Sequence, residues 1–301
     1  MCAPESSFLG NSSRVRRLVR SKDRPHTPEA TMPELSKDTT LCISLAGRPS
    51  NIGTRFHNFL YAELGLDFVY KAFTTTDIAG AIGGVRALGI RGCSVSMPFK
   101  EAVIPLVDHI EHSAAAIGSI NTIVNDGGVL TASNTDYEAI ASLIASHRLD
   151  SAASVLVRGS GGMAKAVVAA FRDAGFADVT VVARNPEAGP ALAESYGFRW
   201  TADDPSPGAD ILVNVTPLGM NGADADAQAF SREHIAAART VFDVVAFPAE
   251  TPLIRAAREA GKDVITGAEV IALQAAGQFA RYTGVTPTPD QIARASAHSR
   301  A

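Results

Sequence analysis

The sequence predicts an α/β fold built in two parts, the second of which is a doubly wound parallel sheet. Short runs rich in Val, Ile and Leu alternate with helix-like segments along most of the chain. A hairpin interrupts this alternation once, and the pattern then restarts at a strand followed by a glycine-rich turn. Repeated strand–helix units with short, Val-rich strands are typical of a parallel sheet that helices cover on both faces.

The first part alternates strands and helices before it reaches the hairpin. The expected strands are Leu41–Leu45, Phe68–Phe73 and Cys93–Ser96, and the expected helices are Arg55–Leu64, Thr76–Leu88 and Glu101–Ile110. The hairpin joins Ile120–Val124 to Val129–Ala132, because the Asp-Gly pair between them tolerates the positive φ of a tight turn. A helix over Tyr137–His147 then links the two parts.

The second part repeats the strand–helix pattern several times. Its expected strands are Ser154–Arg158, Val179–Ala183, Ile211–Val215, Val241–Val245 and Asp263–Ile265. Its expected helices are Ala164–Ala174, Pro186–Tyr196 and Pro252–Ala260. The long amphipathic segment Glu269–Tyr282 is predicted to form the last helix of the chain.

Composition narrows the classes of function. The chain has 301 residues, of which 46% are hydrophobic and 19% charged, enough for two domains with cores. Its net charge of −4 and aromatic content of 6% argue against nucleic acid as a partner. No apolar run is long enough for a membrane span, and the three isolated cysteines indicate neither a disulfide framework nor a metal site. We therefore expect a cytoplasmic protein, as monomer or homodimer, that acts on a small molecule.

The first 36 residues differ from the rest. Six basic residues lie between Arg14 and Arg24, against one acid, and three prolines in residues 25–33 oppose an amphipathic helix. We expect residues 1–36 to form a disordered tail rather than a targeting signal.

A polar segment, Arg48–Asn58 (RPSNIGTRFHN), lies between the first expected strand and the first expected helix. An ordinary turn needs only one or two polar residues, and this one holds six or more. It is either a solvated loop or a set of donors around a ligand, and it is also placed to cap the helix that follows.

The glycine turn of the second part fits the pattern GxGxxA, with Gly159, Gly161 and Ala164 in the three places. The first glycine permits a tight turn, the second lets the backbone approach a pyrophosphate, and the small third residue lets the helix pack on its strand. The next strand ends at Val182-Ala183-Arg184, without the Asp or Glu typical of NAD proteins. Because Arg184 instead suits a 2′-phosphate, the sequence favours NADP over NAD.

Lys100 and Asp136 are the candidate catalytic residues. Lys100 follows an expected strand that Pro98 ends, at the carboxyl edge where the sites of α/β proteins collect. Asp136 begins the linking helix, where the two parts meet. Each has an ordinary alternative, since Lys100 could be a surface lysine and Asp136 a helix cap.

The order of motifs along the chain resembles the shikimate dehydrogenase family across roughly residues 40 to 285. The motifs are Val95–Lys100, Gly118–Thr122, Asn134–Asp136, Gly159–Gly162, Asn214–Met220, Asp243–Pro248, Thr251–Leu253 and Gly267–Gln274. The stretches GRPSN, FHN and IRGCSVSMPFKE are similar to the shikimate-dehydrogenase-like subgroup in particular.

The resemblance implies a substrate-binding catalytic domain at 37–136 with 270–301, and an NADP-binding Rossmann domain at 137–269. It implies hydride transfer between NADP(H) and the 3-position of shikimate or 3-dehydroshikimate. Lys100 would be the catalytic lysine and Asp136 its partner, since a cation beside the carbonyl stabilises the developing alkoxide. The residues implied to contact substrate are Asn121, Gln274 and Ser96, and those implied to line the cofactor site are Gly159, Gly161, Gly162, Arg184, Asn214, Thr216 and Met220.

Departures from the family fall around the substrate. Asn51 and Gly53 stand in the two serine places of the family's first loop, and Thr54 replaces its proline. Ser50, Asn51 and Thr54, with Arg48 and Arg55, are the candidate replacement donors to a carboxylate. Ala246 stands where the family usually has a substrate-contacting Tyr. Losing such hydrogen bonds commonly costs ~1–3 kcal/mol each, so turnover of shikimate is expected to be low.

Three functions remain open on the sequence. The first is an NADP-dependent oxidoreductase acting on shikimate or a related cyclic hydroxy acid. Another is a quinate or aminoshikimate dehydrogenase, and the third is a catalytically idle NADP-binding sensor on the same fold. The presence of both Lys100 and Asp136 favours an enzyme over a sensor.

Overall fold

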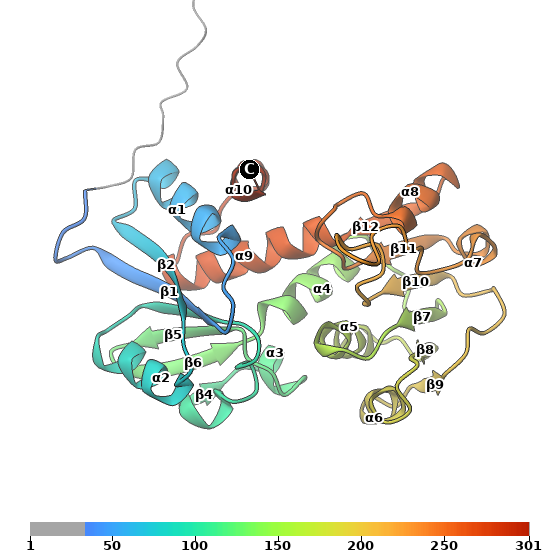
Figure 1. Cartoon of the computed structure of the whole chain (residues 1–301), viewed down its shortest axis with the longest axis horizontal. Coiled ribbons are helices and arrows are strands. Elements are labelled where there is room, and N and C mark those ends of the chain that lie inside the picture. The colour runs from blue at the N-terminus through green and yellow to red at the C-terminus, as the bar shows by residue number, and fades with distance from the viewer. Residues whose placement is uncertain (1–33, 301) are drawn as a thin grey trace, which may run out of the picture. The chain divides into compact units, whose positions relative to one another are not determined.

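The computed structural model describes residues 34–300, which form two six-stranded sheets with helices around them (Figure 1). Residues 1–33 of the predicted tail lie outside the described residues, so the disorder of that tail stays a prediction. The predicted α/β class is confirmed.

The first sheet is mixed. Its strand order is β2-β1-β3-β5-β6-β4, in which β1 pairs parallel with β2 and β3, while β5 pairs antiparallel with β3 and β6. The strands are β1 (Thr40–Ala46), β2 (Phe68–Thr74), β3 (Gly92–Val95), β4 (His109–Ile110), β5 (Thr122–Asp126) and β6 (Val129–Ser133). The predicted hairpin is therefore confirmed as β5 and β6.

Helices lie on both faces of the first sheet because the side chains of a strand alternate between faces. On β1, Ile43 belongs to a core cluster with Ile82 and Val85 of α2 (Ile78–Ala87). The neighbouring Cys42 belongs to a second cluster, with residues of α1 (Ile52–Leu64) and of the C-terminal helices. A short helix, α3 (His112–Ala115), precedes β5.

The predicted helix over Glu101–Ile110 is wrong. The segment instead forms a 3₁₀ turn at Ile104–Leu106 and then β4, which pairs parallel with β6. Pro105 explains the difference, because proline lacks an N–H and disfavours helical backbone at the residue before it. Asp108 then ties the segment to the sheet, since its Oδ2 accepts from the Leu130 N–H at 2.7 Å.

The second sheet is entirely parallel, with the order β12-β11-β10-β7-β8-β9. The strands are β7 (Val155–Arg158), β8 (Val179–Val182), β9 (Arg199–Thr201), β10 (Ile211–Asn214), β11 (Thr240–Asp243) and β12 (Asp263–Thr266). Its helices are α5 (Gly162–Asp173), α6 (Ala188–Ser195), α7 (Arg232–Ala237) and α8 (Pro252–Glu259). Strands β8 and β9 follow β7 on one side, and β10, β11 and β12 follow on its other side. The strand order therefore reverses between β7 and β10, the point where sheets of this kind bind ligands.

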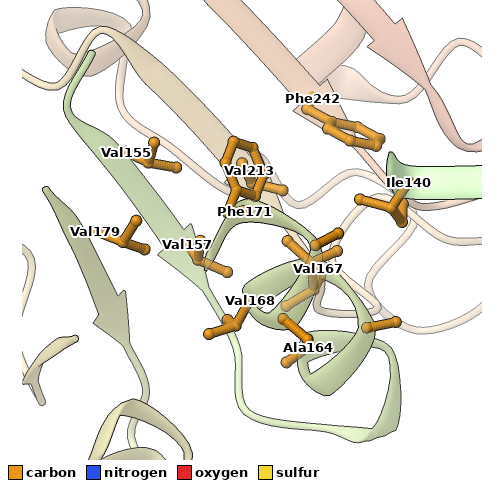
Figure 2. Packing of buried hydrophobic residues seen from close by; sticks show 14 of the residues in the cluster. Ile140, Val155, Val157, Ala164, Val167, Val168, Phe171, Val179, Val213 and Phe242 are labelled. Carbon is orange, nitrogen blue, oxygen red and sulfur yellow. The ribbon is translucent and has the colours of Figure 1, made fainter. Parts of the chain in front are cut away.

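Figure 2 shows how α5 packs on this sheet. Val167 and Phe171 of α5 contact the core that Val155 and Val157 of β7 help to form. Ala164 is fully buried at the start of the helix, and its small side chain allows the helix to approach β7 closely. The linking helix α4 (Thr135–Ser146) joins the same core through residues such as Ile140.

The C-terminal helices return to the first sheet. Phe279 and Tyr282 of α9 (Gly267–Thr283) are buried in one cluster with Cys42 of β1 and Tyr61 of α1. The predicted helix Glu269–Tyr282 is confirmed, but it is not the last. A further helix, α10 (Pro289–Arg300), packs on α1 through residues such as Ala295.

The sequence carries a signal for α10 in Thr288-Pro-Asp-Gln291. Thr288 Oγ1 accepts from the Gln291 N–H at 3.3 Å, and Gln291 Oε1 accepts from the Thr288 N–H at 2.8 Å, which is a capping box. The packing of α9 and α10 on the first sheet supports our proposal that residues 270–301 belong with residues 37–136 in one domain. Within residues 34–300, no helix combines the length and the apolar character that crossing a bilayer requires.

Candidate active site

Lys100 and Asp136 form an ion pair. Lys100 Nζ donates to Asp136 Oδ2 at 2.6 Å, and the two side chains are 30% and 15% exposed. The backbone of Lys100 is also held, because its carbonyl accepts from the Ile120 N–H at 2.8 Å. A partly buried pair whose ammonium is still reachable can offer a proton and a positive charge to a ligand oxygen.

Asp136 is free to make this pair because another residue caps α4. Asn134 is the N-cap, and its Oδ1 accepts from the N–H groups of Asp136 and Tyr137, both at 3.1 Å. The ordinary interpretation of Asp136 as the helix cap is therefore wrong. Its carboxylate lies in the first turn of α4, where the helix dipole also favours a negative charge.

The polar segment before α1 divides into two groups of residues. His57 and Asn58 belong to the fold: His57 is fully buried, and the Asn58 side chain makes two hydrogen bonds of 2.9 Å with the backbone of Tyr70. Ser50 and Asn51, by contrast, are exposed. Asn51 takes the N-cap position of α1, but its side chain makes no capping hydrogen bond, so the expected capping role is wrong and the amide stays available.

Two further residues of this segment, Gly53 and Thr54, are half-buried. Thr54 Oγ1 is buried and has no hydrogen-bond partner among residues 34–300, which leaves a hydroxyl that a ligand could use. Gly53 packs against Tyr70, since a Cβ at Gly53 would lie 3.6 Å from the Tyr70 hydroxyl. Ser96 is exposed directly after β3, and its backbone N–H donates to the Leu45 carbonyl at 2.9 Å.

Asn121 and Gln274, which are distant in sequence, meet at one hydroxyl group. Thr135 Oγ1 donates to Asn121 Oδ1 at 3.1 Å and accepts from Gln274 Nε2 at 3.1 Å. Asn121 is 3% exposed, and Gln274 is half-buried on α9. Since Thr135 directly precedes Asp136, this junction adjoins the Lys100–Asp136 pair along the chain.

The glycine loop has the features of a phosphate-binding turn. Gly159 has a φ of +118°, and a Cβ there would lie 2.9 Å from side-chain carbons of Val215 and Thr216, so only glycine fits. Gly161 is the N-cap of α5 and supplies no side-chain cap, while both it and Gly162 have open space where a Cβ would lie. Open space in front of uncapped N–H groups at a helix start fits a pyrophosphate.

Arg184 is exposed two residues beyond β8. No hydrogen bond or ion pair joins its side chain to another residue of the described part of the chain, 34–300. The next side chain, Asn185, is used within the protein, because its Oδ1 accepts from the N–H groups of Glu187 and Ala188 at 2.9 Å. The guanidinium of Arg184 is thus a cation at the place where the adenosine ribose of a dinucleotide is bound in this type of sheet.

Asn214 was predicted to line the cofactor site, and in the structure its side chain is hydrogen-bonded within the protein. It is fully buried, its Nδ2 donates to Asp243 Oδ1 at 3.0 Å, and its Oδ1 accepts from the N–H and hydroxyl of Thr216 at 3.0 and 2.6 Å. With both ends of its amide used in this way, Asn214 shapes the loop after β10 instead of pointing to a ligand. Thr216 is half-buried and Met220 is exposed, so these two residues of the loop remain candidates for contact with the cofactor.

Asp243 supports the same region from β11. This carboxylate is fully buried and accepts from Asn214, from the Val245 N–H at 3.0 Å and from the Thr251 hydroxyl at 2.6 Å. Burial raises its pKa, and the three hydrogen bonds act in the opposite direction. The sequence placed Asp243 in a motif without giving it a role, although an acid at the end of an apolar strand is itself a signal. It holds the loops after β10 and β11 together.

The comparisons with known proteins agree with this geometry. Residues 51–123 match the family model described as the shikimate dehydrogenase substrate binding domain. A shikimate dehydrogenase-like protein of Haemophilus influenzae is 56% identical over 267 residues, which cover 88% of this chain and 98% of the relative. The chain belongs to the shikimate dehydrogenase family.

Two other members of the shikimate dehydrogenase family extend the comparison. The NADP(+) shikimate dehydrogenase of Pelodictyon phaeoclathratiforme is 35% identical over 263 residues, covering 82% of this chain and 93% of that protein. The crystal structure of the Thermus thermophilus shikimate 5-dehydrogenase in complex with NADP(H) and shikimate superposes with a TM-score of 0.77. That pair is 30% identical, over 86% of this chain and 99% of the other. The mixed and parallel sheets are therefore the fold of shikimate dehydrogenases.

Proposed function

We propose that this shikimate dehydrogenase family member is an NADP-dependent oxidoreductase that interconverts shikimate and 3-dehydroshikimate, or a closely related cyclic hydroxy acid. The Lys100–Asp136 pair carries the proposal, because it unites a cation and a carboxylate at 2.6 Å while both stay partly exposed. The Pelodictyon NADP(+) shikimate dehydrogenase and the Thermus shikimate 5-dehydrogenase in complex with NADP(H) and shikimate support this choice of substrate and cofactor.

The chain's own residues would act on the substrate oxygen. During oxidation, Lys100 Nζ takes the hydroxyl proton and passes one of its own protons to the Asp136 carboxylate, while NADP⁺, when bound, would supply the hydride acceptor. In the reverse direction Lys100 Nζ returns the proton to the developing alkoxide. Asp136 accepts a hydrogen bond from Lys100 and so orients the ammonium, and a charge fixed in place costs no reorganisation at the moment of reaction.

NADP as the cofactor is part of the same proposal. The glycine loop at Gly159–Gly162 suits the pyrophosphate, and the Arg184 guanidinium suits a 2′-phosphate through paired hydrogen bonds. No acidic residue lies at the end of β8 to take the ribose hydroxyls of NAD.

The polar segment before α1 supports slow turnover of shikimate itself. Gly53 offers no hydroxyl, and the side chain nearest to it is the Tyr70 phenol, which is already hydrogen-bonded to Ser94 at 2.6 Å. Thr54 retains an unpaired hydroxyl and Asn51 a free amide. These groups suit a carboxylate or hydroxyl, and they favour a related cyclic hydroxy acid as the better substrate.

The test is reduction of NADP⁺ by the purified protein with a panel of cyclic hydroxy acids, shikimate and quinate included. We expect Lys100→Ala to lower kcat at least 1,000-fold while NADP⁺ still binds, since the group that moves the proton is lost; general acid–base groups contribute about 10²–10⁴-fold. Lys71→Ala, at an exposed lysine of β2, is the matched control. NADP⁺ binding without turnover of any member of the panel would favour the idle sensor.

A further inference from the structure

A continuous chain of hydrogen bonds leads to Asn121, which with Gln274 is one of the two amides predicted to bind substrate. It begins at the Tyr70 hydroxyl, which lies 2.6 Å from Ser94 Oγ, and Ser94 Oγ donates to Gln278 Oε1 at 3.2 Å. Gln278 Nε2 then donates to Thr122 Oγ1 at 3.1 Å and to the Asn121 carbonyl at 3.2 Å. From the sequence, Thr122 was given no role of its own and Gln278 was not singled out, although Gln278 lies one helical turn after Gln274 on the same face of α9.

The direction of the Asn121 amide follows from backbone groups, which have only one hydrogen-bonding role each. The Thr135 N–H can only donate, and it donates to Asn121 Oδ1 at 2.8 Å. The Thr122 hydroxyl, which accepts from Gln278, donates to the same oxygen at 2.7 Å and also lies 3.2 Å from the Thr135 hydroxyl. Asn121 Oδ1 is thus occupied, while its Nδ2 has no partner among the described residues 34–300.

The Gln274 amide has the opposite orientation to that of Asn121, because its nitrogen and not its oxygen contacts Thr135. The Thr135 hydroxyl lies 3.1 Å from Asn121 Oδ1, to which it donates, and its oxygen accepts from Gln274 Nε2 at 3.1 Å. Gln274 Oε1 has no partner in the described part of the chain. Thr135 is 1% exposed, and its hydroxyl contacts both amides. Among residues 34–300, the N–H₂ of Asn121 and the carbonyl oxygen of Gln274 remain without a partner.

We propose that Thr135 is a positioning residue that sets the donor and acceptor pattern offered to the substrate. Asn121 donates to a ligand oxygen, and Gln274 accepts from a ligand hydroxyl. This inference rests on the proposed function, because it assumes that the ligand reacts beside Asp136, the residue after Thr135.

One experiment exchanges the two amides for carboxylates, so that each variant adds the same negative charge. Asn121→Asp puts an acceptor where the pattern requires a donor, and we expect its KM for shikimate to rise at least 100-fold. Gln274→Glu keeps an acceptor, and we expect its KM to rise less than 10-fold. Equal losses in the two variants, or the larger loss in Gln274→Glu, would overturn the assigned pattern.

A second experiment needs no turnover. In protein labelled with ¹⁵N on Asn and Gln, the Gln274 side-chain N–H₂ signals are assigned as those missing from Gln274→Glu. Thr135→Val keeps the branched shape beside Gly277, whose Cβ would lie 3.4 Å from Thr135 Cγ2, but lacks the hydroxyl. We expect these signals to move in Thr135→Val and to return in Thr135→Ser.

Unchanged Gln274 signals in Thr135→Val would refute the positioning role of Thr135. In the kinetic measurement, we expect Thr135→Val to raise KM at least 10-fold with a smaller loss in kcat, since Lys100 and Asp136 stay paired. If the wild-type protein turns over none of the cyclic hydroxy acids, the proposed function fails, and the spectroscopic result still decides the role of Thr135.

Discussion

Lowering the pH should destabilise this protein through one histidine of its core. His57 on α1 is fully buried, and neither of its ring nitrogens has a hydrogen-bond partner in the described part of the chain. Its ring is stacked on Tyr70 at 4.4 Å between centroids and lies 6.1 Å from Phe279. Burial lowers the pKa of His57 from 6.5 to about 3, and the Gln278 side chain acts in the opposite direction.

The sign and size of the effect follow from proton linkage. Between pH 6.5 and about 3, the unfolded chain binds a proton at residue 57 and the folded chain does not. The free energy of unfolding therefore falls as the pH falls through this range, at about 1.4 kcal/mol per pH unit. The loss from His57 reaches about 2 kcal/mol at pH 5 and roughly 4 kcal/mol at pH 3.

The assay compares the free energy of unfolding in urea at pH 7.5 and at pH 5.0. His57→Phe keeps an aromatic ring between Tyr70 and Phe279 and removes the titrating group, so we expect the wild-type protein to lose about 2 kcal/mol more than this variant. His109→Gln, at an exposed histidine of β4, is the control and should follow the wild type. The same pH dependence in wild type and His57→Phe would refute the reasoning.

Three further predictions concern the cofactor half of the site. Asp243→Ala should lower the free energy of unfolding by more than about 3 kcal/mol, since three buried donors lose their acceptor; calorimetry would measure this, and a loss below about 1 kcal/mol would contradict it. Arg184→Ala should weaken NADP⁺ binding at least 10-fold and leave NAD⁺ binding unchanged, as titration calorimetry can determine, whereas parallel losses would argue against a 2′-phosphate contact. Gly159→Ala should weaken the binding of both cofactors, because its φ of +118° and the 2.9 Å approach to Val215 exclude a side chain; unchanged fluorescence titrations would contradict this.

Local patterns predicted the elements that depend on nearby residues. Most strands of the two sheets, the Asp-Gly hairpin and the glycine turn before α5 were predicted, because the period and the turn residues lie within short segments; β4 and β9, of two and three residues, were missed. Two of the misjudged segments also have local reasons. Pro105 prevents the expected helix over residues 101–110. The capping box at Thr288 is a sequence signal for the start of α10, which was not predicted from the sequence.

The cytoplasmic location and the state as monomer or homodimer remain predictions, as do the roles given to individual site residues. For the polar segment before α1, sequence could not separate ligand donors from structural groups. His57 and Asn58 serve the core and the sheet, whereas Thr54 keeps an unpaired hydroxyl. That division depends on which face of α1 meets the sheet.

By itself, the sequence determined the α/β class, the dinucleotide-type turn and the presence of Lys100 and Asp136, because each depends on residue type and short-range order. Only the tertiary structure decided which groups meet. Asn134 caps α4, so the Asp136 carboxylate is available to pair with Lys100. The Asn214 side chain is hydrogen-bonded within its own loop. The Thr135 hydroxyl contacts the amides of Asn121 and Gln274, which come from distant segments. Hydrogen-bond partners are set by distance and direction in space, and a linear pattern contains neither.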